Sequence, residues 1–339
     1  MTPQLGWAIV GIGAHADRYI APAIRKASGA RLVAVYSRDQ ARSAGFAAKH
    51  GALGGYASFE ALLADPRVNV AYIASPNSLH APQTIAAARA GKHVLCEKPM
   101  ATTVADARAM IEACAEAGVK LGVGFHLRHH PAHLDARSYI VRGDLGEVTG
   151  AWAQWCTAFG LPAPRVGLRT WWDDPALAGG GVVVGWGGHV LDLLRFLLGR
   201  EVVEVAAFTD AAEERPLEER ASILLRFQGG VQGVIATSLR SPAGRNDVAV
   251  HGTLGSVFSL GTQTAGFRRE LALVKETVSQ RTEYLMGDMY LAEVEAMCQA
   301  IVDDREPTAS GWDGLKVVEI TEAIYQSQRE RRTVELSPG

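Results

Sequence analysis

The chain has 339 residues, of which 48% are apolar and 21% are charged, a balance that excludes a disordered or fibrous protein. Its 34 basic and 36 acidic residues give a net charge of −2. No basic excess exists to neutralise phosphates, so a nucleic-acid partner is not expected. The length predicts about two domains.

Neither a membrane span nor a secretory leader is expected. The best apolar candidate, residues 190–198, contains Asp192 and Arg195 and is shorter than the roughly 18 residues that span a bilayer. The N-terminus lacks a basic stretch before its first apolar residues. The cysteines form no CxxC pair, which predicts reduced, mostly buried thiols in a cytoplasmic protein. They are Cys96, Cys114, Cys156 and Cys298.

The first 125 residues alternate short apolar strands with helical segments. The expected strands are 7–10, 31–36, 68–74, 92–96 and 119–125. The expected helices are 16–28, 39–50, 58–64, 79–90 and 103–117. Continuous apolar strands that alternate with helices are typical of a parallel sheet covered on both faces. An α/β domain with a doubly wound parallel sheet is therefore predicted over residues 1–125.

Strand-like segments dominate the rest of the chain. They are expected at 147–157, 201–209, 221–227, 233–239, 247–252, 256–260 and 271–277. Helices are expected at 131–142, 188–198, 290–303 and 313–331. This pattern predicts a second, α+β domain over residues 126–339, built on an open, mostly antiparallel sheet. The last helix is a candidate to pack back on the first domain.

A glycine-rich turn follows the first predicted strand. Gly11-Ile12-Gly13-Ala14-His15-Ala16 is the GxGxxG pattern with alanine in the third glycine's place. The first glycine permits a tight turn, and the second lets the main chain approach a pyrophosphate. The following helix offers free N–H groups to that anion. The motif predicts a dinucleotide-binding Rossmann domain, the alternative being an ordinary turn.

The end of the second predicted strand bears on which cofactor is preferred. An acidic residue there would accept the ribose hydroxyls of NAD, but the chain has Ser37 followed by Arg38, with Arg42 one helical turn further on. Guanidinium groups bind phosphate through paired, charge-assisted bonds. NADP is therefore expected, with NAD as the alternative if both arginines are only solvated surface charges. Asp39 is expected to cap the next helix.

Several motifs further along carry a family resemblance. Ser75-Pro76-Asn77 and His80 follow one predicted strand, and Glu97-Lys98-Pro99 follows the next. Further marks are Gly179-Gly180-Gly181, His189-Val190-Leu191-Asp192 and Asp313-Gly314-Leu315. Over about residues 5–336 the chain resembles the glucose–fructose oxidoreductase, inositol dehydrogenase and rhizopine catabolism (Gfo/Idh/MocA) family. The Glu-Lys-Pro sequence is its most specific mark.

The resemblance implies NAD(P)-dependent oxidation or reduction of a sugar, a polyol or a related cyclic or carbonyl compound. It also implies a Rossmann domain followed by an open-faced sheet domain, through which two or four subunits often pair. A homodimer or homotetramer is therefore expected, with a small-molecule substrate and no membrane or nucleic-acid partner. Cofactor contacts are expected from Ser75, Pro76, Asn77, His80, Glu97 and Lys98.

Two residues fall on the family's catalytic positions. Lys98 could donate a hydrogen bond to the reacting oxygen, or take its proton if burial lowers the pKa of the ammonium group. His189 precedes a helix and could transfer a proton to or from the substrate oxygen. Pro99 is a candidate cis proline.

The sequence departs from the family pattern at Gly185, where many members have an aspartate four residues before the histidine. Three explanations stay open. Lys98 and His189 could suffice, Asp173 or Asp174 could replace the missing acid, or the protein could bind ligand without catalysis. The last possibility defines the alternative function, a non-catalytic NAD(P)-binding sensor or regulator.

The remaining candidates concern the substrate. His126 and Arg128 follow the last predicted strand of the first domain, where clefts open in such folds, and they are candidates to contact substrate. The alternative for Arg128 is a plain interdomain salt bridge. Trp172 and Trp186 flank the glycine run and offer flat apolar faces that suit a sugar ring, the alternative being packing in the sheet and the subunit interface. The histidine-rich segment 126–133 is interrupted by Pro131 and has no carboxylate, so no metal site is predicted.

Overall fold

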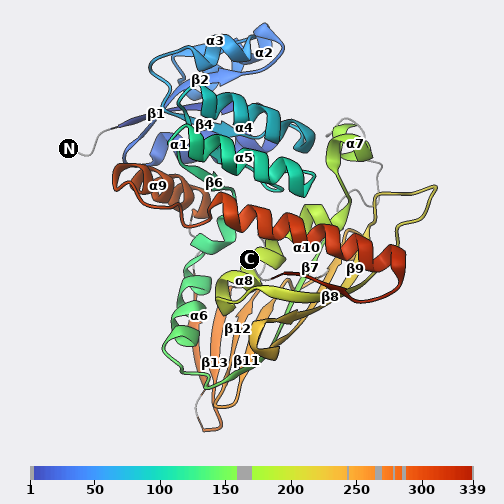
Figure 1. Cartoon of the computed structure of the whole chain (residues 1–339). Helices are drawn as coiled ribbons and strands as arrows, with labels where there is room; N and C mark the ends of the chain where they lie inside the picture. Colours follow the sequence, from blue (N-terminus) through green and yellow to red (C-terminus); the bar gives the residue numbers. More distant parts are fainter. Residues whose placement is uncertain are drawn as a thin grey trace. The chain divides into compact units, whose positions relative to one another are not determined.

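The computed structural model describes residues 4–158, 170–242, 244–263, 269–277, 279–284 and 288–337 (Figure 1). The chain forms two compact units. Residues 1–126 and 288–318 form the first unit, and residues 127–287 and 319–339 form the second. The sequence division assigned everything after residue 125 to one domain, whereas the contacts place 288–318 with the first unit.

Sheet A of the first unit is parallel and has six strands in the described residues, in the order β3-β2-β1-β4-β5-β6. Strand β1 is buried along nearly its whole length, as expected for a sheet covered on both faces. The strands are β1 (Leu5–Val10), β2 (Ala30–Tyr36), β3 (Gly54–Tyr56), β4 (Val70–Ile73), β5 (His93–Cys96) and β6 (Leu121–Val123).

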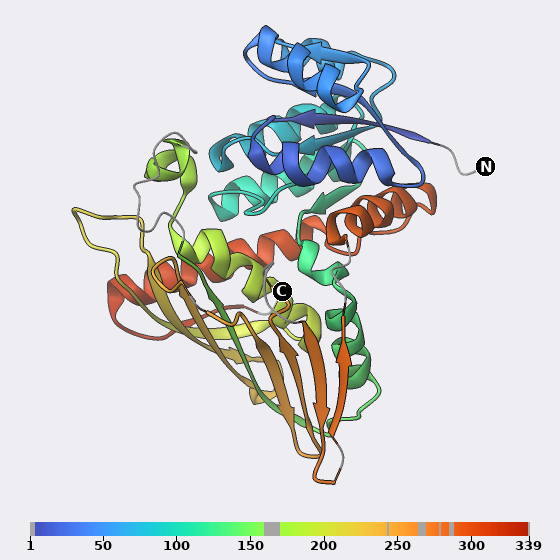
Figure 2. The same ribbon diagram turned by 180° about the vertical axis from the view of Figure 1, so that it is seen from behind.

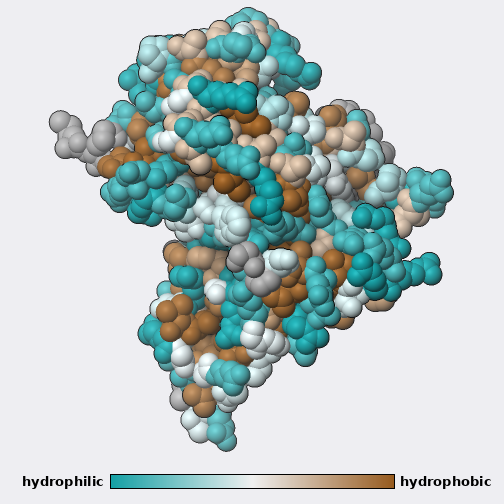
Figure 3. Space-filling view, viewed as in Figure 1, coloured by the Kyte–Doolittle hydropathy of each residue, from teal (hydrophilic) through white to brown (hydrophobic). Residues whose placement is uncertain are grey.

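Helices pack on both faces of sheet A. Trp7 and Ile9 belong to a core that includes residues of α1 and α9, while Ala8 and Val10 belong to a core that includes residues of α4, α5 and α10. Hydrophilic and hydrophobic residues are mixed on the face of the molecule that carries α4 and α5 (Figure 3). The helices are α1 (Ala21–Lys26), α2 (Gln40–His50), α3 (Phe59–Leu63), α4 (His80–Arg89), α5 (Val104–Glu116), α9 (Met289–Val302) and α10 (Gly311–Glu330), whose second half belongs to the other unit.

Sheet B of the second unit has its strands side by side in the order β14-β13-β12-β11-β7-β10-β9-β8-β15 (Figure 2). All pairs are antiparallel except β7 with β10. Buried and exposed residues alternate strictly along β9, so this sheet has one covered and one open face. The strands are β7 (Val148–Cys156), β8 (Val202–Thr209), β9 (Arg220–Phe227), β10 (Gln232–Ser238), β11 (Val248–Gly252), β12 (Ser256–Leu260), β13 (Glu270–Val274), β14 (Ser279–Glu283) and β15 (Val334–Glu335).

The second unit also contains α6 (Pro131–Val141), α7 (Pro175–Ala178) and α8 (Gly188–Leu198), which follows a π-helical turn at Val183–Gly187. The stretch Pro175–Leu198 is long and apolar enough to cross a membrane by length and composition alone, which is weak evidence for a span. Most of it is buried within the fold, as in a core helix.

The predicted fold class is confirmed: the first unit has a doubly wound parallel sheet, and the second unit has a mostly antiparallel sheet. The short strands β3 and β14 were not predicted, since Gly54–Tyr56 and Ser279–Glu283 carry no apolar run. All four cysteines are free and buried, which agrees with the predicted thiols. Asp39 caps α2 as expected, accepting from the main-chain N–H groups of Ala41 and Arg42 at 2.9 and 3.1 Å.

Candidate active site

The glycine-rich turn after β1 leaves room for a ligand. Gly11 has φ +96°, and a Cβ there would lie 2.6 Å from the main chain of Ala74 and Ser75, so only glycine fits. A Cβ on Gly13 would meet no atom within 4 Å, and Gly13 and Ala14 are exposed. His15 precedes the π-helical turn Ala16–Ile20, which continues directly into α1. Open space beside a helix N-terminus fits the pyrophosphate of a dinucleotide.

The end of β2 presents two arginines to solvent. In the described part of the chain, the guanidinium groups of Arg38 and Arg42 form no hydrogen bond or ion pair, and both residues are exposed. The hydroxyl of Ser37 accepts from the N–H of Asp39 at 3.3 Å. Asp39 is the only acidic residue among residues 37–42, and its carboxylate is bound to the start of α2. This segment therefore offers no free carboxylate to the ribose hydroxyls of a cofactor.

The segment after β4 supports the Glu-Lys-Pro turn. The side chains of Asn77 and His80 are almost completely buried, at 3% and 1% exposure. The imidazole of His80 lies 2.8 Å from the Pro99 carbonyl and 2.9 Å from the Ser75 carbonyl. The His80 ring therefore lies between Ser75 and Pro99, and its predicted contact with the cofactor stays a prediction. The Lys98–Pro99 peptide bond is cis, as anticipated.

Glu97 is the centre of this turn. Its carboxylate accepts hydrogen bonds from the Tyr72 hydroxyl and, at 3.2 Å, from the Lys98 N–H, and it lies 2.8 Å from His15 Nε2. Burial opposes ionisation, but His15, the Tyr72 hydrogen bond and Lys98 hold the pKa of Glu97 well below its usual range. Glu97 is therefore an anion that fixes the main chain of Lys98. The Glu97 carboxylate is itself held mainly by contacts with other residues of the chain.

Aromatic rings pack around the start of the first helix. Tyr290, the second residue of α9, stacks on Tyr19 at 4.9 Å and meets His15 edge-on at 5.3 Å. The ring of His126 lies 4.6 Å from Tyr290, so this predicted substrate residue is held by an aromatic neighbour. The sequence analysis did not identify Tyr72 or Glu293 as candidate site residues, because each resembles an ordinary residue of its strand or helix.

In the second unit, His189 lies at the second position of α8 with 4% exposure. Its ring stacks on Trp155 at 5.0 Å, and Trp155 stacks on Trp186 at 5.5 Å with an interplanar angle of 8°. The Trp186 indole N–H donates to the Thr157 hydroxyl at 3.1 Å. The sequence did not predict the stack of Trp155 on His189, because alternation along a strand does not reveal a contact with a distant helix.

An indole ring covers Gly185, the position where many family members have an aspartate. A Cβ on Gly185 would lie 3.6 and 3.8 Å from ring atoms of Trp172, which itself stacks on Trp171. Asp174 accepts from the Ala176 N–H at 2.9 Å and caps α7. Asp174 is thus engaged in capping, which weakens its case as a replacement for the acid.

Arg128 and Asp192 form a buried ion pair within the second unit. Arg128 Nε and Nη2 donate to the two Asp192 oxygens at 2.8 and 2.6 Å, and both residues are at most 5% exposed. Arg195 Nη1 lies 3.8 Å from Asp192, and Arg195 binds Glu201 through two further hydrogen bonds. The structure thus gives Arg128 a salt bridge, which was the alternative to a substrate contact, and this pair ties Arg128 to α8 within the second unit.

The histidine-rich segment makes structural contacts. His133 Nδ1 donates to the Leu127 carbonyl and Nε2 accepts from the Thr262 hydroxyl, both at 2.8 Å. Burial and the nearby His130 lower the pKa of His133 to about 3, so the ring is neutral. Among the residues that the structure describes, no three His, Cys, Asp or Glu side chains are grouped to hold a metal ion.

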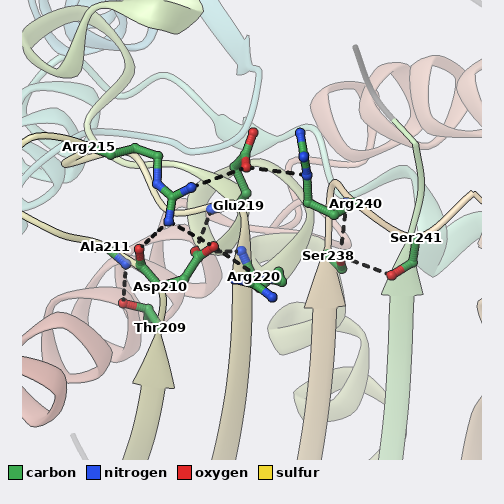
Figure 4. Close-up of polar contacts among 9 residues, drawn as sticks. All are labelled: Thr209, Asp210, Ala211, Arg215, Glu219, Arg220, Ser238, Arg240 and Ser241. Carbon is green, nitrogen blue, oxygen red and sulfur yellow. Dashed lines mark hydrogen bonds and ion pairs between the residues drawn. The ribbon is translucent and has the colours of Figure 1, made fainter. Parts of the chain in front are cut away.

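A cavity of about 860 Å³ lies on sheet B, and none of the predicted substrate residues lines it. Arg240 and Ser241 at its rim belong to a polar network at the strand ends (Figure 4). There the Asp210 carboxylate accepts from the main chain of Glu219 and Arg220 at 2.8 and 2.9 Å. The other lining residues include Trp152, Gln154, Cys156, Val234, Arg245 and Asp247.

Comparisons with known proteins match both halves of the chain. The profile described as "Oxidoreductase family, NAD-binding Rossmann fold" (GFO_IDH_MocA) matches residues 5–125, and "GFO/IDH/MocA C-terminal domain" matches residues 133–258. The chain is 32% identical to 1,5-anhydro-D-fructose reductase of Ensifer adhaerens, over 98% of this chain and 99% of that one. It is 30% identical to D-xylose 1-dehydrogenase (NADP(+)) 2 of Haloferax volcanii, over 97% and 98%.

A solved structure is also similar to this chain over nearly its whole length. The aldose-aldose oxidoreductase of Caulobacter crescentus, complexed with glycerol, is 32% identical, with a TM-score of 0.89 over 98% of this chain and 100% of that one. These relatives are named as reductases, dehydrogenases or oxidoreductases, which supports catalysis. They give no support to a non-catalytic nucleotide sensor.

Proposed function

Since this chain belongs to the Gfo/Idh/MocA family and is a nicotinamide-dependent oxidoreductase of CH–OH or C=O groups, we propose that its substrate is a sugar, a polyol or a related cyclic compound. The observation that carries the proposal is the turn Glu97-Lys98-Pro99. In it, contacts with His15 and Tyr72 hold Glu97 as an anion beside Lys98. A bound nicotinamide would accept or supply the hydride.

The chain's own residues would handle the oxygen and its proton. Lys98 would donate a hydrogen bond to the reacting oxygen and polarise it, and His189 would give or take the proton of that oxygen. The parallel rings of Trp155 and Trp186 beside His189 offer flat faces for a sugar ring, a role in which Trp172 and His126 are further candidates.

The test replaces Lys98 by alanine and measures turnover on a panel of sugars and polyols. Removing a general acid or base lowers kcat about 10²- to 10⁴-fold. The Kd of NADPH, followed by fluorescence, should change far less. Lys49→Ala is the control, since that side chain is largely exposed and binds Asp17. An unchanged kcat in Lys98→Ala would remove the assignment.

We propose that NADP is preferred over NAD. Support comes from the exposed Arg38 and Arg42 and from Asp39, whose carboxylate is bound to the start of α2. Arg38→Ala should lower kcat/KM for NADPH about tenfold and leave that for NADH nearly unchanged, because the lost contact is to the 2′-phosphate. Arg25→Ala, another exposed arginine, serves as control. A wild-type preference for NADH would contradict this proposal.

We further propose a cytoplasmic homodimer or homotetramer that pairs through the open face of sheet B. Leu224 and Val234 lie opposite each other on β9 and β10, and they are 54% and 46% exposed. Val234 is also opposite Trp152 on β7, so an apolar row crosses three strands. Leu224→Glu should shift sedimentation toward a smaller species, and an unchanged assembly would argue against this face. Four unpaired, buried cysteines support the cytoplasmic location.

A further inference from the structure

The cavity on sheet B has no part in the proposed reaction. Three residues of β7 line it, Trp152, Gln154 and Cys156. They share one face of the sheet, because successive residues of a strand point to opposite faces. Trp155 lies between them in the sequence, and on the other face its ring stacks on His189 at 5.0 Å. Sheet B therefore separates this cavity from the proposed catalytic histidine.

The floor of the cavity is largely apolar. Val234 and Ala236 of β10 pair with two of these β7 residues, Trp152 and Gln154, and they also line the cavity. Trp152 is half-buried, so part of its indole ring stays open to a ligand. The volume of about 860 Å³ lies within the roughly 300–1,000 Å³ that small-molecule sites occupy. Size and lining thus suit a small ring compound.

The connection between β10 and β11 brings two arginines to this cavity. Because β7 lies between these two strands in sheet B, Arg240 after β10 and Arg245 before β11 flank the end of β7. The Asn246 side-chain oxygen accepts from the Cys156 N–H at 2.6 Å. A Cβ on Gly244 would lie 2.5 Å from the Cys156 Cβ, so the main chain packs tightly against β7 there. Arg245, between Gly244 and Asn246, is thereby fixed beside the cavity.

Each guanidinium is directed by one carboxylate and keeps most of its donors. Arg240 Nε lies 3.6 Å from Glu219, and Arg245 Nε lies 3.1 Å from Asp247. Among the residues that the structure describes, neither guanidinium has another partner. The two side chains are 49% and 66% exposed. Since an arginine offers its Nη groups as a planar fork, both arginines can still bind an anion through paired N–H bonds.

Positive charge is left over at this end of the sheet. Figure 4 shows Glu219 between Arg215 and Arg240, at 3.6 Å from a nitrogen of each. Asp210 pairs with Arg215 and with Arg220, at 3.3 and 3.0 Å. Three arginines thus share two carboxylates. An anionic ligand beside Arg240 would balance the remaining charge.

We propose that this cavity binds a small cyclic compound that carries a phosphate or a carboxylate group. Arg240 and Arg245 would hold the anionic group through charge-assisted hydrogen bonds, which are the strong ones. The indole of Trp152 and the apolar floor would hold the ring. Val234 also belongs to the proposed pairing face of sheet B, so a second copy of the chain is the competing occupant.

The test is titration calorimetry on the full chain saturated with NADPH, which fills the phosphate sites of the cofactor. The probe is phenyl phosphate, which has the ring and the anion but no CH–OH group to be oxidised. Phenol and inorganic phosphate each lack one of the two parts, and both should bind at least about tenfold more weakly. Benzoate replaces the phosphate by a carboxylate, and the tighter of the two anionic probes identifies the class of ligand.

Variants assign the binding to the cavity. Arg240→Gln and Arg245→Gln should each raise the Kd of phenyl phosphate about tenfold, because each loses a charged donor pair. Trp152→Leu should raise it about fivefold and leave the Kd of inorganic phosphate unchanged, because only the ring contact is lost. Arg220→Gln is the matched control, since Arg220 is exposed, binds Asp210 and does not line the cavity.

Two outcomes would overturn the proposal. An equal Kd in the wild type and in both cavity arginine variants would place the anion elsewhere on the protein. If the wild type bound neither anionic probe, while Arg240→Gln or Arg245→Gln changed the sedimentation of the protein, the cavity would serve subunit pairing and not a ligand. Neither outcome bears on the proposed hydride transfer, which turnover measurements test separately.

Discussion

Glu97 in the first compact unit is mostly buried and Glu218 in the second is buried, and each carboxyl accepts from a tyrosine hydroxyl and from the main chain. Glu97 accepts from Tyr72 and from the Lys98 N–H. Glu218 accepts from Tyr325 at 3.0 Å, from the Gly181 N–H at 3.1 Å and from the Val183 N–H at 2.9 Å. The first organises the turn of the proposed catalytic lysine, and the second organises the start of the helix that leads to His189.

Their ionisation differs because of the charges nearby. Burial raises the pKa of both carboxyls, but at Glu97 the contacts with His15, the Tyr72 hydrogen bond and the charge of Lys98 outweigh burial and lower it. At Glu218 burial is the largest effect, and the hydrogen bonds from the main chain and Tyr325 only partly offset it, so the pKa is raised. Dipoles alone do not make a buried carboxyl an anion here, whereas a neighbouring cation does.

The largest expected effect on stability comes from two glycines, one packed against each of these glutamates. A Cβ on Gly181 would lie 2.1 Å from the Glu218 carbonyl oxygen, which is main chain and cannot turn away. A Cβ on Gly124 would lie 3.3 Å from the Glu97 carboxylate, which needs a shift of only a few tenths of an ångström. Gly181→Ala should therefore lower the free energy of unfolding by about 3 kcal/mol and Gly124→Ala by about 1 kcal/mol, measured by urea unfolding.

If the two variants lost the same unfolding free energy, it would not matter whether the added Cβ meets main-chain atoms, as at Gly181, or a side chain, as at Gly124. Gly13→Ala provides the matched control, because its Cβ would meet nothing within 4 Å. It should leave stability within about 0.5 kcal/mol of the wild type, while weakening cofactor binding.

A change of intermediate size in the free energy of unfolding is expected when the Glu218 carboxyl is removed. Glu218→Ala leaves two N–H groups at the start of a helix and the Tyr325 hydroxyl without their acceptor. The expected loss is about 2 kcal/mol of unfolding free energy, since each buried donor left unsatisfied is costly. Glu218→Gln keeps one oxygen and should lose less. If both variants matched the wild type in urea unfolding, Glu218 would not be holding this helix.

The smallest effect is a contrast in pH dependence. The raised pKa of Glu218 means that its contribution is complete below the unfolded value and is lost as the pH rises through the folded value. The lowered pKa of Glu97 means that its contribution is present above the unfolded value and is lost as the pH falls. From pH 4 to 7, Glu218→Gln should therefore gain on the wild type and Glu97→Gln should lose, each by about 1 kcal/mol.

Urea unfolding at several pH values measures both slopes. Slopes of the same sign would show that the cations near Glu97 do not control its charge. The Glu97 variant could also change cofactor affinity, so stability is to be measured without cofactor.

Residue patterns within short segments were enough to predict much of the candidate site. The turn at residues 11–15, the Asp39 cap and the cis proline after Lys98 depend on the conformation of a few neighbouring residues, and the structure has the expected features. The predictions for Arg128 and His80 depended on distant partners. Arg128 binds Asp192, 64 positions away, and His80 binds Pro99, 19 positions away, so short segments do not reveal these contacts.

The sequence by itself determined the two-sheet architecture, the glycine turn and the Glu-Lys-Pro motif, because strand alternation, main-chain freedom and capping are local properties. Only the tertiary structure decided the partners of these residues. It placed His15 and Tyr72 on Glu97, Trp155 on His189 and the Trp172 ring over Gly185. The physical reason is that charge and packing energies depend on distance in space, and the folded chain brings together side chains that the sequence separates by tens of residues.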